Sequence, residues 1–184
     1  MDEIRETPWP GQTYRQGIEL ADQLGFNCIN HVVVAFRPVQ DTFLPGQNFE
    51  QAFDFFEWPT RPGYFIQYKA WSTQNPVHLQ STYGHEVMFD GRKVYPNPFV
   101  LKHYPIRSQA HGQRKILKER KPRFDPQERA DGAHTHYDSF ADTSSFIWRR
   151  DDLKPWNAQT RAEVLESARI HMSTHLSKEQ AHER

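Results

Sequence analysis

The chain has 184 residues, with 23 Lys+Arg balanced by 23 Asp+Glu, and 36 % of its residues are hydrophobic. This length suits one domain with a buried core, and the balanced charge excludes wholesale disorder and disfavours nucleic-acid binding by the whole surface. No apolar run approaches the ~20 residues that cross a bilayer, and the first residues are too acidic for a signal peptide. The single cysteine, Cys28, excludes an intrachain disulfide, and we expect a buried thiol in a reducing, cytoplasmic location.

The amino-terminal third predicts a helix, a strand and a long loop. Thr13 and Gln16 have capping-box spacing, which predicts a helix to about residue 24 with Gly25 as its stop. The apolar, β-branched run 28–37 predicts a buried strand that ends before Pro38. Residues 39–63 alternate turn residues with aromatics and predict an ordered loop, with a short helix within 49–56.

The middle of the chain predicts strands around one tight turn. Residues 64–71 and 99–104 have strand composition, and Pro105 ends the second run. Between them, EVMFDGRKVYP carries Asp90-Gly91 between two short alternating runs, which predicts a two-residue β-hairpin. Ser108 is placed to cap a basic helix over about 109–121, ended by Pro122.

The last third predicts a short strand near 145–149 and a terminal helix. Thr160 and Glu163 have capping-box spacing, which predicts a helix from there to about residue 175. Its apolar face consists of Val164, Leu165, Ala168 and Met172. The predicted fold class is therefore α/β, with a mixed sheet, a β-hairpin and flanking helices.

Positive charge is concentrated between Lys102 and Arg129, where nine Lys/Arg stand against three Asp/Glu. A basic helix is most often a solvated face, but this one follows directly from the end of a predicted strand. Strand ends are where open α/β sheets bind ligands. Guanidinium groups such as Arg107 and Arg114, mixed with ammonium groups such as Lys115, suit phosphate oxygens. The stretch therefore predicts a phosphorylated or diphosphate ligand.

Histidines recur beside these elements without a recognisable metal motif. His85 precedes the predicted hairpin, His103 lies on a predicted strand, and His134 and His136 form an HTH loop sequence. The spacing matches no HExxH or similar zinc pattern. A lone histidine is more often a satisfied polar residue than a ligand, so the spacing alone predicts no metal site.

Several segments together resemble the second half of a bacterial family 2 glycosyltransferase, an enzyme class with the nucleotide-sugar-dependent GT-A fold. They are MDEIRETPWPGQTYRQGIELADQLGFNCINHVVVAFRPVQDTF, YFIQYKAW, GHEVMFDGRKVYPNPFVLKHYPIRSQAHGQRKILKERKPRF and HTHYD. The resemblance covers about residues 2–150, and its most specific part is GHEVMFDGR with LKHYPIRSQAHGQRK. It implies a nucleotide-sugar donor, an acceptor of unknown identity and a divalent cation, Mg²⁺ or Mn²⁺.

The resemblance also implies roles for individual residues. DEIRE is similar to the end of the Asp-x-Asp motif, so Asp2 would bind the metal with Glu3 beside it. His103 would be a further metal ligand or a leaving-group contact. Cations of the basic stretch would bind the donor diphosphate, and they are Lys102, Arg107, Arg114 and Lys115. His85 and Glu86 would contact the acceptor or act as the catalytic base. The sequence does not decide which of the two has which role.

The nucleotide-binding half that opens a GT-A enzyme is not represented in this sequence, and Met1 stands where the first acid of the motif would be. We therefore expect residues 1–155 to be a partial GT-A-like domain and residues 156–184 to be a carboxyl-terminal helix and tail. The expectation is of a truncated enzyme, inactive alone, that associates with itself or with a missing half through an exposed sheet edge.

Two other functions compete with the transferase. One is a non-catalytic remnant that binds a phosphorylated or anionic partner through residues 102–129, without a metal. The other is a nucleic-acid binder that uses the basic helix, which we rank last because aromatics are not interleaved with its cations. We therefore expect no nucleic-acid partner and no membrane span.

Overall fold

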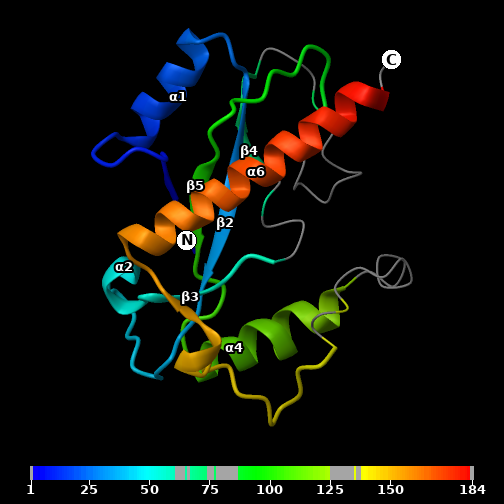
Figure 1. Cartoon of the computed structure of the whole chain (residues 1–184). Coiled ribbons are helices and arrows are strands. Elements are labelled where there is room, and N and C mark those ends of the chain that lie inside the picture. Colours follow the sequence, from blue (N-terminus) through cyan, green and yellow to red (C-terminus); the bar gives the residue numbers. More distant parts are fainter. Residues whose placement is uncertain are drawn as a thin grey trace. The chain divides into compact units, whose positions relative to one another are not determined.

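The structure is a computed structural model, and it describes residues 2–60, 65, 67–73, 77, 87–124, 135 and 138–182. The chain divides into two compact units, each drawn from separate stretches of the sequence. Unit 1 contains residues 1–35, 58–103 and 156–184, and unit 2 contains residues 36–57 and 104–155. Figure 1 shows the elements in sequence colours.

The described residues of unit 1 form strands and helices of a mixed α/β layer. In chain order these are β1 (Glu3–Glu6), α1 (Tyr14–Gln23), β2 (Cys28–Phe36), β4 (Gln67–Trp71), β5 (Phe99–His103) and α6 (Ala158–His182). β5 lies between β1 and β2, antiparallel to β1 and parallel to β2, and β4 pairs antiparallel with β2. The α/β class and the mixed sheet are therefore confirmed.

The strand β2 is buried along its whole length, as its continuous apolar sequence predicted. Its register with β4 shifts between Ile29 and Asn30. The Asn30 side chain satisfies the backbone at this irregularity, because its Nδ2 donates to the Phe65 carbonyl at 2.6 Å and its Oδ1 accepts from Gln67 N–H at 2.9 Å. A buried amide paired in this way stabilises the strand junction instead of costing free energy.

Helices α1 and α6 each begin at a side-chain cap. Thr13 and Gln16 form the predicted capping box of α1. In α6 the cap is Asn157, since its Oδ1 accepts from Thr160 N–H at 3.0 Å. The prediction that Thr160 caps this helix was wrong by about one turn, because Thr160 lies within the first turn and its Oγ1 accepts a hydrogen bond from the Asn157 N–H. Val164, Leu165, Ala168 and Met172 are all buried, as predicted.

The Asp90-Gly91 turn is present, with Gly91 at φ 73° and a hydrogen bond from Arg92 N–H to the Phe89 carbonyl. The predicted β-hairpin around it is not found in the described residues. Residues 87–89 and 92–98 form no strand there, and Val94 makes a single parallel bridge to Cys28. The turn is instead fixed by Asn27, whose amide bonds Gly91 O and Lys93 N–H.

The elements that the structure describes in unit 2 are short. They are α2 (Phe49–Ala52), β3 (Phe55–Glu57), α4 (Gln109–Gly112), the π-helical η2 (Gln113–Arg120), the 3₁₀ turns η3 (Lys121–Arg123) and η5 (Arg150–Asp152), and β6 (Lys154–Pro155). β3 and β6 pair antiparallel. The predicted strand near 145–149 was wrong: its residues form no strand, and β6 begins only at Lys154.

The core of unit 2 is largely aromatic. Tyr104 stacks on Phe36 and on Phe49, with ring centroids 4.9 Å and 5.0 Å apart. A second cluster joins Ile106, Ile116 and Phe146 beneath the basic helix. The apolar residues of that helix therefore point inward, while its cations occupy the remaining face.

Candidate functional site

The residues predicted to bind the metal lie together in unit 1. Asp2 precedes β1 and His103 ends β5, and Glu3 is the register partner of His103 across this antiparallel pair. The Asp2 Oδ2 lies 3.9 Å from the His103 Nε2. The two side chains are 39 % and 27 % exposed, so the pair is accessible to a small ligand. The sheet thus joins residues that are a hundred positions apart in the sequence.

The donor set of this pair fits a divalent cation in part. Carboxylate oxygens suit Mg²⁺ and Mn²⁺, which commonly take one or two carboxylates and fill their remaining positions with water or phosphate. Imidazole nitrogen suits the later transition metals better. Among the described residues, no group of three or more His, Cys, Asp or Glu is arranged to hold an ion. The pair would therefore supply only part of a coordination shell.

Lys102 has a structural partner in the same unit. Its ammonium pairs with the Glu6 carboxylate across β1 and β5, and its side chain is 8 % exposed. The indole of Trp156 lies beside it, 5.9 Å from ring centroid to Nζ. A buried cation needs such a partner, so this contact helps to fix β1 on β5. A diphosphate contact by Lys102 stays a prediction.

The remaining predicted cations lie in unit 2 around His111. The Arg107 Nη2 lies 3.0 Å from His111 Nε2, and the Arg107 guanidinium also lies 5.7 Å from the Phe49 ring centroid. Lys115 Nζ donates to the Pro105 carbonyl at 2.9 Å. Arg114 is well exposed and pairs with Glu119 at 3.2 Å. Ser108 caps α4 and so fixes where the basic helix begins. Arg107 therefore lies just before the helix, and Arg114 and Lys115 lie after its first turn.

This positive environment acts on the protonation of His111. Burial, and then the charges of Arg107, Lys115 and Arg114, lower the pKa of His111 to about 4. The imidazole is therefore neutral at physiological pH. An anion that bound these cations would offset their charge and raise that pKa.

Two predicted residues, His85 and Glu86, lie outside the described residues, as do His134 and His136. The predicted diphosphate contacts belong to different units: Lys102 is part of unit 1, and Arg107, Arg114 and Lys115 are part of unit 2.

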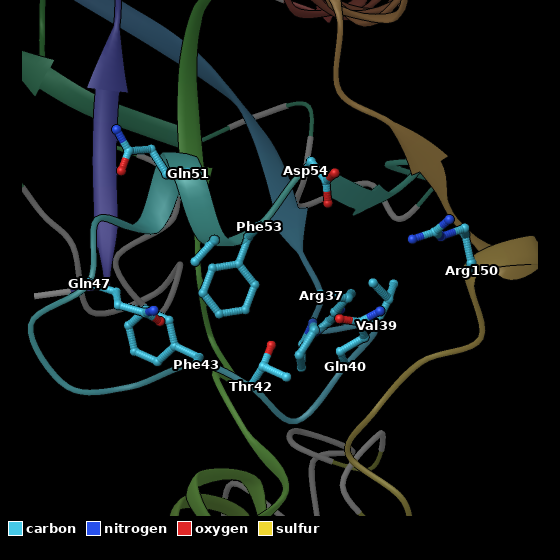
Figure 2. Close-up of a pocket in the computed structure, with 12 residues that line it drawn as sticks. Arg37, Val39, Gln40, Thr42, Phe43, Gln47, Gln51, Phe53, Asp54 and Arg150 are labelled. Atoms are coloured by element: carbon cyan, nitrogen blue, oxygen red, sulfur yellow. The ribbon is translucent and has the colours of Figure 1, made fainter.

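Sequence reasoning assigned no ligand to the segment 37–54, although most of its residues line a pocket in unit 2 together with Arg150 (Figure 2). The available signal was the alternation of polar side chains with phenylalanines in QDTFLPGQNFEQAFD. That pattern has neither the helical nor the strand period, so it does not predict which of these side chains share a face.

Comparison with models of protein families finds no match to this chain, and comparisons with curated proteins and with solved structures find no significant similarity. Across the part of the chain that the structure describes, no helix combines the length and apolar character needed to cross a membrane.

Proposed function

We propose that the chain is part of a family 2 glycosyltransferase, which moves a sugar from a nucleotide-sugar donor to an acceptor. The observation that carries the proposal is the approach of Asp2 to His103, 3.9 Å apart on neighbouring strands. The sequence resemblance independently points to the same two residues as metal-site candidates. A carboxylate and an imidazole at this separation can both contact one bound group.

In this proposal, Asp2 and His103 would hold a divalent cation, which offsets the charge that develops on the departing nucleoside diphosphate. Asp2 contributes a negative donor, and His103 contributes a neutral nitrogen when deprotonated. By the sequence resemblance, Arg107, Arg114 and Lys115 of unit 2 are the candidates to donate hydrogen bonds to phosphate oxygens. Either His85 or Glu86 would contact the acceptor or remove its hydroxyl proton.

The test measures Mn²⁺ binding by electron paramagnetic resonance, with and without pyrophosphate, and hydrolysis of a panel of sugar nucleotides. Asp2→Asn and His103→Gln should each weaken Mn²⁺–pyrophosphate binding at least about tenfold, because each removes a donor. Glu19→Gln is the matched control, since Glu19 is an exposed carboxylate on α1 of the same unit. Wild-type protein that binds neither probe, or variants that bind as the wild type does, would contradict the proposal.

A second candidate is a module that binds an anionic partner through the basic stretch without a metal. The low pKa of His111 favours it, because Arg107, Lys115 and Arg114 all contribute to the positive potential there. Binding of a polyanion such as heparin should then weaken steeply with salt and weaken further in Arg107→Gln. Asp2→Asn should leave that binding unchanged, whereas the same substitution should impair the transferase.

A further inference from the structure

The pocket in unit 2 has a volume of about 370 Å³ and is formed by three segments. They are the chain that follows β2, the helix α2 with the turn before it, and η5. Figure 2 shows Asp54 and Arg150 extending from different segments toward the space beside Arg37, Val39 and Gln40. Its volume suits a ligand of one or two rings.

Arg37 forms one wall of the pocket, and several contacts hold its side chain in place. The Arg37 Nε and Nη2 donate to Glu57 Oε2 at 3.1 Å and 2.6 Å, and the guanidinium lies 4.7 Å from the Trp148 ring centroid. The Trp148 N–H donates to the Pro38 carbonyl at 2.8 Å, which holds the next residue of the wall. A wall fixed in this way is organised before a ligand arrives, so less entropy is lost on binding.

The floor of the pocket is aromatic. Phe53 is 3 % exposed, and the ring of Phe43 lies 5.2 Å from it, centroid to centroid. Phe43 also stacks on Phe49 at 5.4 Å, which fixes the orientation of its ring. Aromatic rings offer apolar contact area with a negative face, which suits the C–H groups of a ligand.

Polar side chains surround this floor and are available to a ligand. In the described part of the chain, no hydrogen bond or ion pair engages the side chains of Gln40, Thr42, Gln51 and Asp54. Gln47 uses only its Oε1, which accepts from Leu44 N–H at 2.8 Å. Arg150 packs over the Phe55 ring at 4.8 Å to the centroid and forms no ion pair with Asp54. The pocket thus presents both donors and acceptors.

The charges of this site are balanced. Glu57 neutralises Arg37, and the Asp54 carboxylate offsets the Arg150 guanidinium. An anion would meet the Asp54 carboxylate, and an apolar ligand would leave several polar groups without water or partners. Hydroxyl groups donate and accept in turn, so a neutral ligand rich in hydroxyls matches the amides, the Thr42 hydroxyl, the carboxylate and the guanidinium.

We propose that this pocket binds a neutral saccharide of one or two sugar rings. The hydroxyls would bond Asp54, Arg150 and the glutamine amides, and a ring face would lie on Phe43. The proposal stands on unit 2 alone and does not depend on the transferase chemistry. It concerns binding only, and it requires neither a metal nor a nucleotide.

The experiment is saturation-transfer NMR and calorimetry of the full chain with glucose, galactose, mannose, N-acetylglucosamine and their disaccharides, in the presence of EDTA. At least one sugar should bind, and Asp54→Asn and Gln51→Ala should each weaken that binding about five- to twentyfold. Asp142→Asn is the matched control, because Asp142 is an exposed carboxylate of unit 2 outside the pocket. These exposed substitutions should leave the thermal unfolding midpoint unchanged.

Three results would overturn the proposal. The first is that no sugar of the panel gives a signal with folded protein. The second is that sugar binding survives both Asp54→Asn and Gln51→Ala undiminished, which would place it elsewhere. The third is that glycine or inorganic phosphate binds more tightly than every sugar and depends on Arg150, which would assign the pocket to a charged ligand. Because EDTA removes divalent cations, failure here is distinct from failure at Asp2 and His103.

Discussion

The Tyr14 hydroxyl lies 3.0 Å from Nε2 of His31, and this contact joins helix α1 to the buried strand β2. Both rings also pack edge to face against Phe99. His31 is fully buried, and burial, followed by the nearby charge of Arg5, lowers its pKa to about 3. The neutral imidazole is therefore a structural requirement of unit 1, which makes this contact sensitive to acid.

Stability should fall as the pH is lowered from 7 to 5, and His31 should account for part of the loss. The unfolded chain binds a proton near the ordinary histidine pKa of about 6.5, whereas folded His31 stays neutral until the pH approaches 3. The unfolded state therefore binds more protons in this interval, so the free energy of unfolding rises with pH. The contribution of His31 between pH 7 and pH 5 is about 2 kcal/mol.

Urea unfolding at several pH values, compared between wild type and His31→Gln, measures this contribution. The variant should be less stable at pH 7 and should show a shallower pH dependence. Carboxylates in both proteins remain largely ionised above pH 5, so they do not account for a difference in slope. Equal slopes in the two proteins would contradict a neutral, buried His31.

The charge of Arg107 should be detectable in the titration of His111. Burial is the larger cause of the low pKa of His111 and Arg107 is the second, so Arg107→Ala should raise that pKa part of the way toward its ordinary value. The imidazole resonances, followed by NMR between pH 3 and pH 8, give the shift. Arg123→Ala is the control, because the charges that lower this pKa are those of Arg107, Lys115 and Arg114. An unchanged pKa in Arg107→Ala would refute the assignment.

Asn157→Ala should destabilise the chain by about 1 kcal/mol, because it removes the side-chain acceptor at the start of α6. Asn157→Asp should retain most of the stability, since a carboxylate accepts the same bond and suits the positive end of the helix. Chemical denaturation followed by circular dichroism compares the variants. If the two substitutions are equally destabilising, capping is not what Asn157 contributes.

Gly17→Ala should destabilise unit 1, although alanine favours helices more than glycine does. A Cβ at this position would lie 2.5 Å from Thr7 Cγ2 and 2.9 Å from Phe99 Cζ. Such overpacking costs about 1–3 kcal/mol, which exceeds the gain of about 1 kcal/mol in helix propensity. Glu19→Ala, at an exposed position of the same helix, is the control and should leave the thermal unfolding midpoint almost unchanged. If Gly17→Ala instead raises the midpoint, the contacts with Thr7 and Phe99 relax without cost.

Local signals were sufficient for elements whose energetics are local. The Thr13–Gln16 capping box, the Gly25 stop, the Ser108 cap and the Gly91 turn depend on residues within a few positions of one another, and all are present. The apolar run of β2 was also recognisable, because a strand buried on both faces needs apolar residues at every position.

Neighbours distant in sequence decided the rest. Whether the residues after Gly91 form a hairpin depends on competition between partners, and Cys28 and Asn27 provide the pairing found for residues 91–95. Thr160 and Asn157 both carry capping side chains, and the position of α6, fixed in part by Arg161 on the Thr7 and Pro8 carbonyls, sets where the helix begins.

The candidate sites divide in the same way. Asp2, His103 and Arg107 were named as candidates through a sequence resemblance, but the 3.9 Å approach of Asp2 to His103 exists only through the β1–β5 register. The pocket at Asp54 and Arg150 could not be located from sequence, since its residues come from short elements and connecting segments whose pattern has no helical or strand period. The sequence alone determined which side chains were present and which short elements they form, whereas packing over long chain separations decided which of them meet.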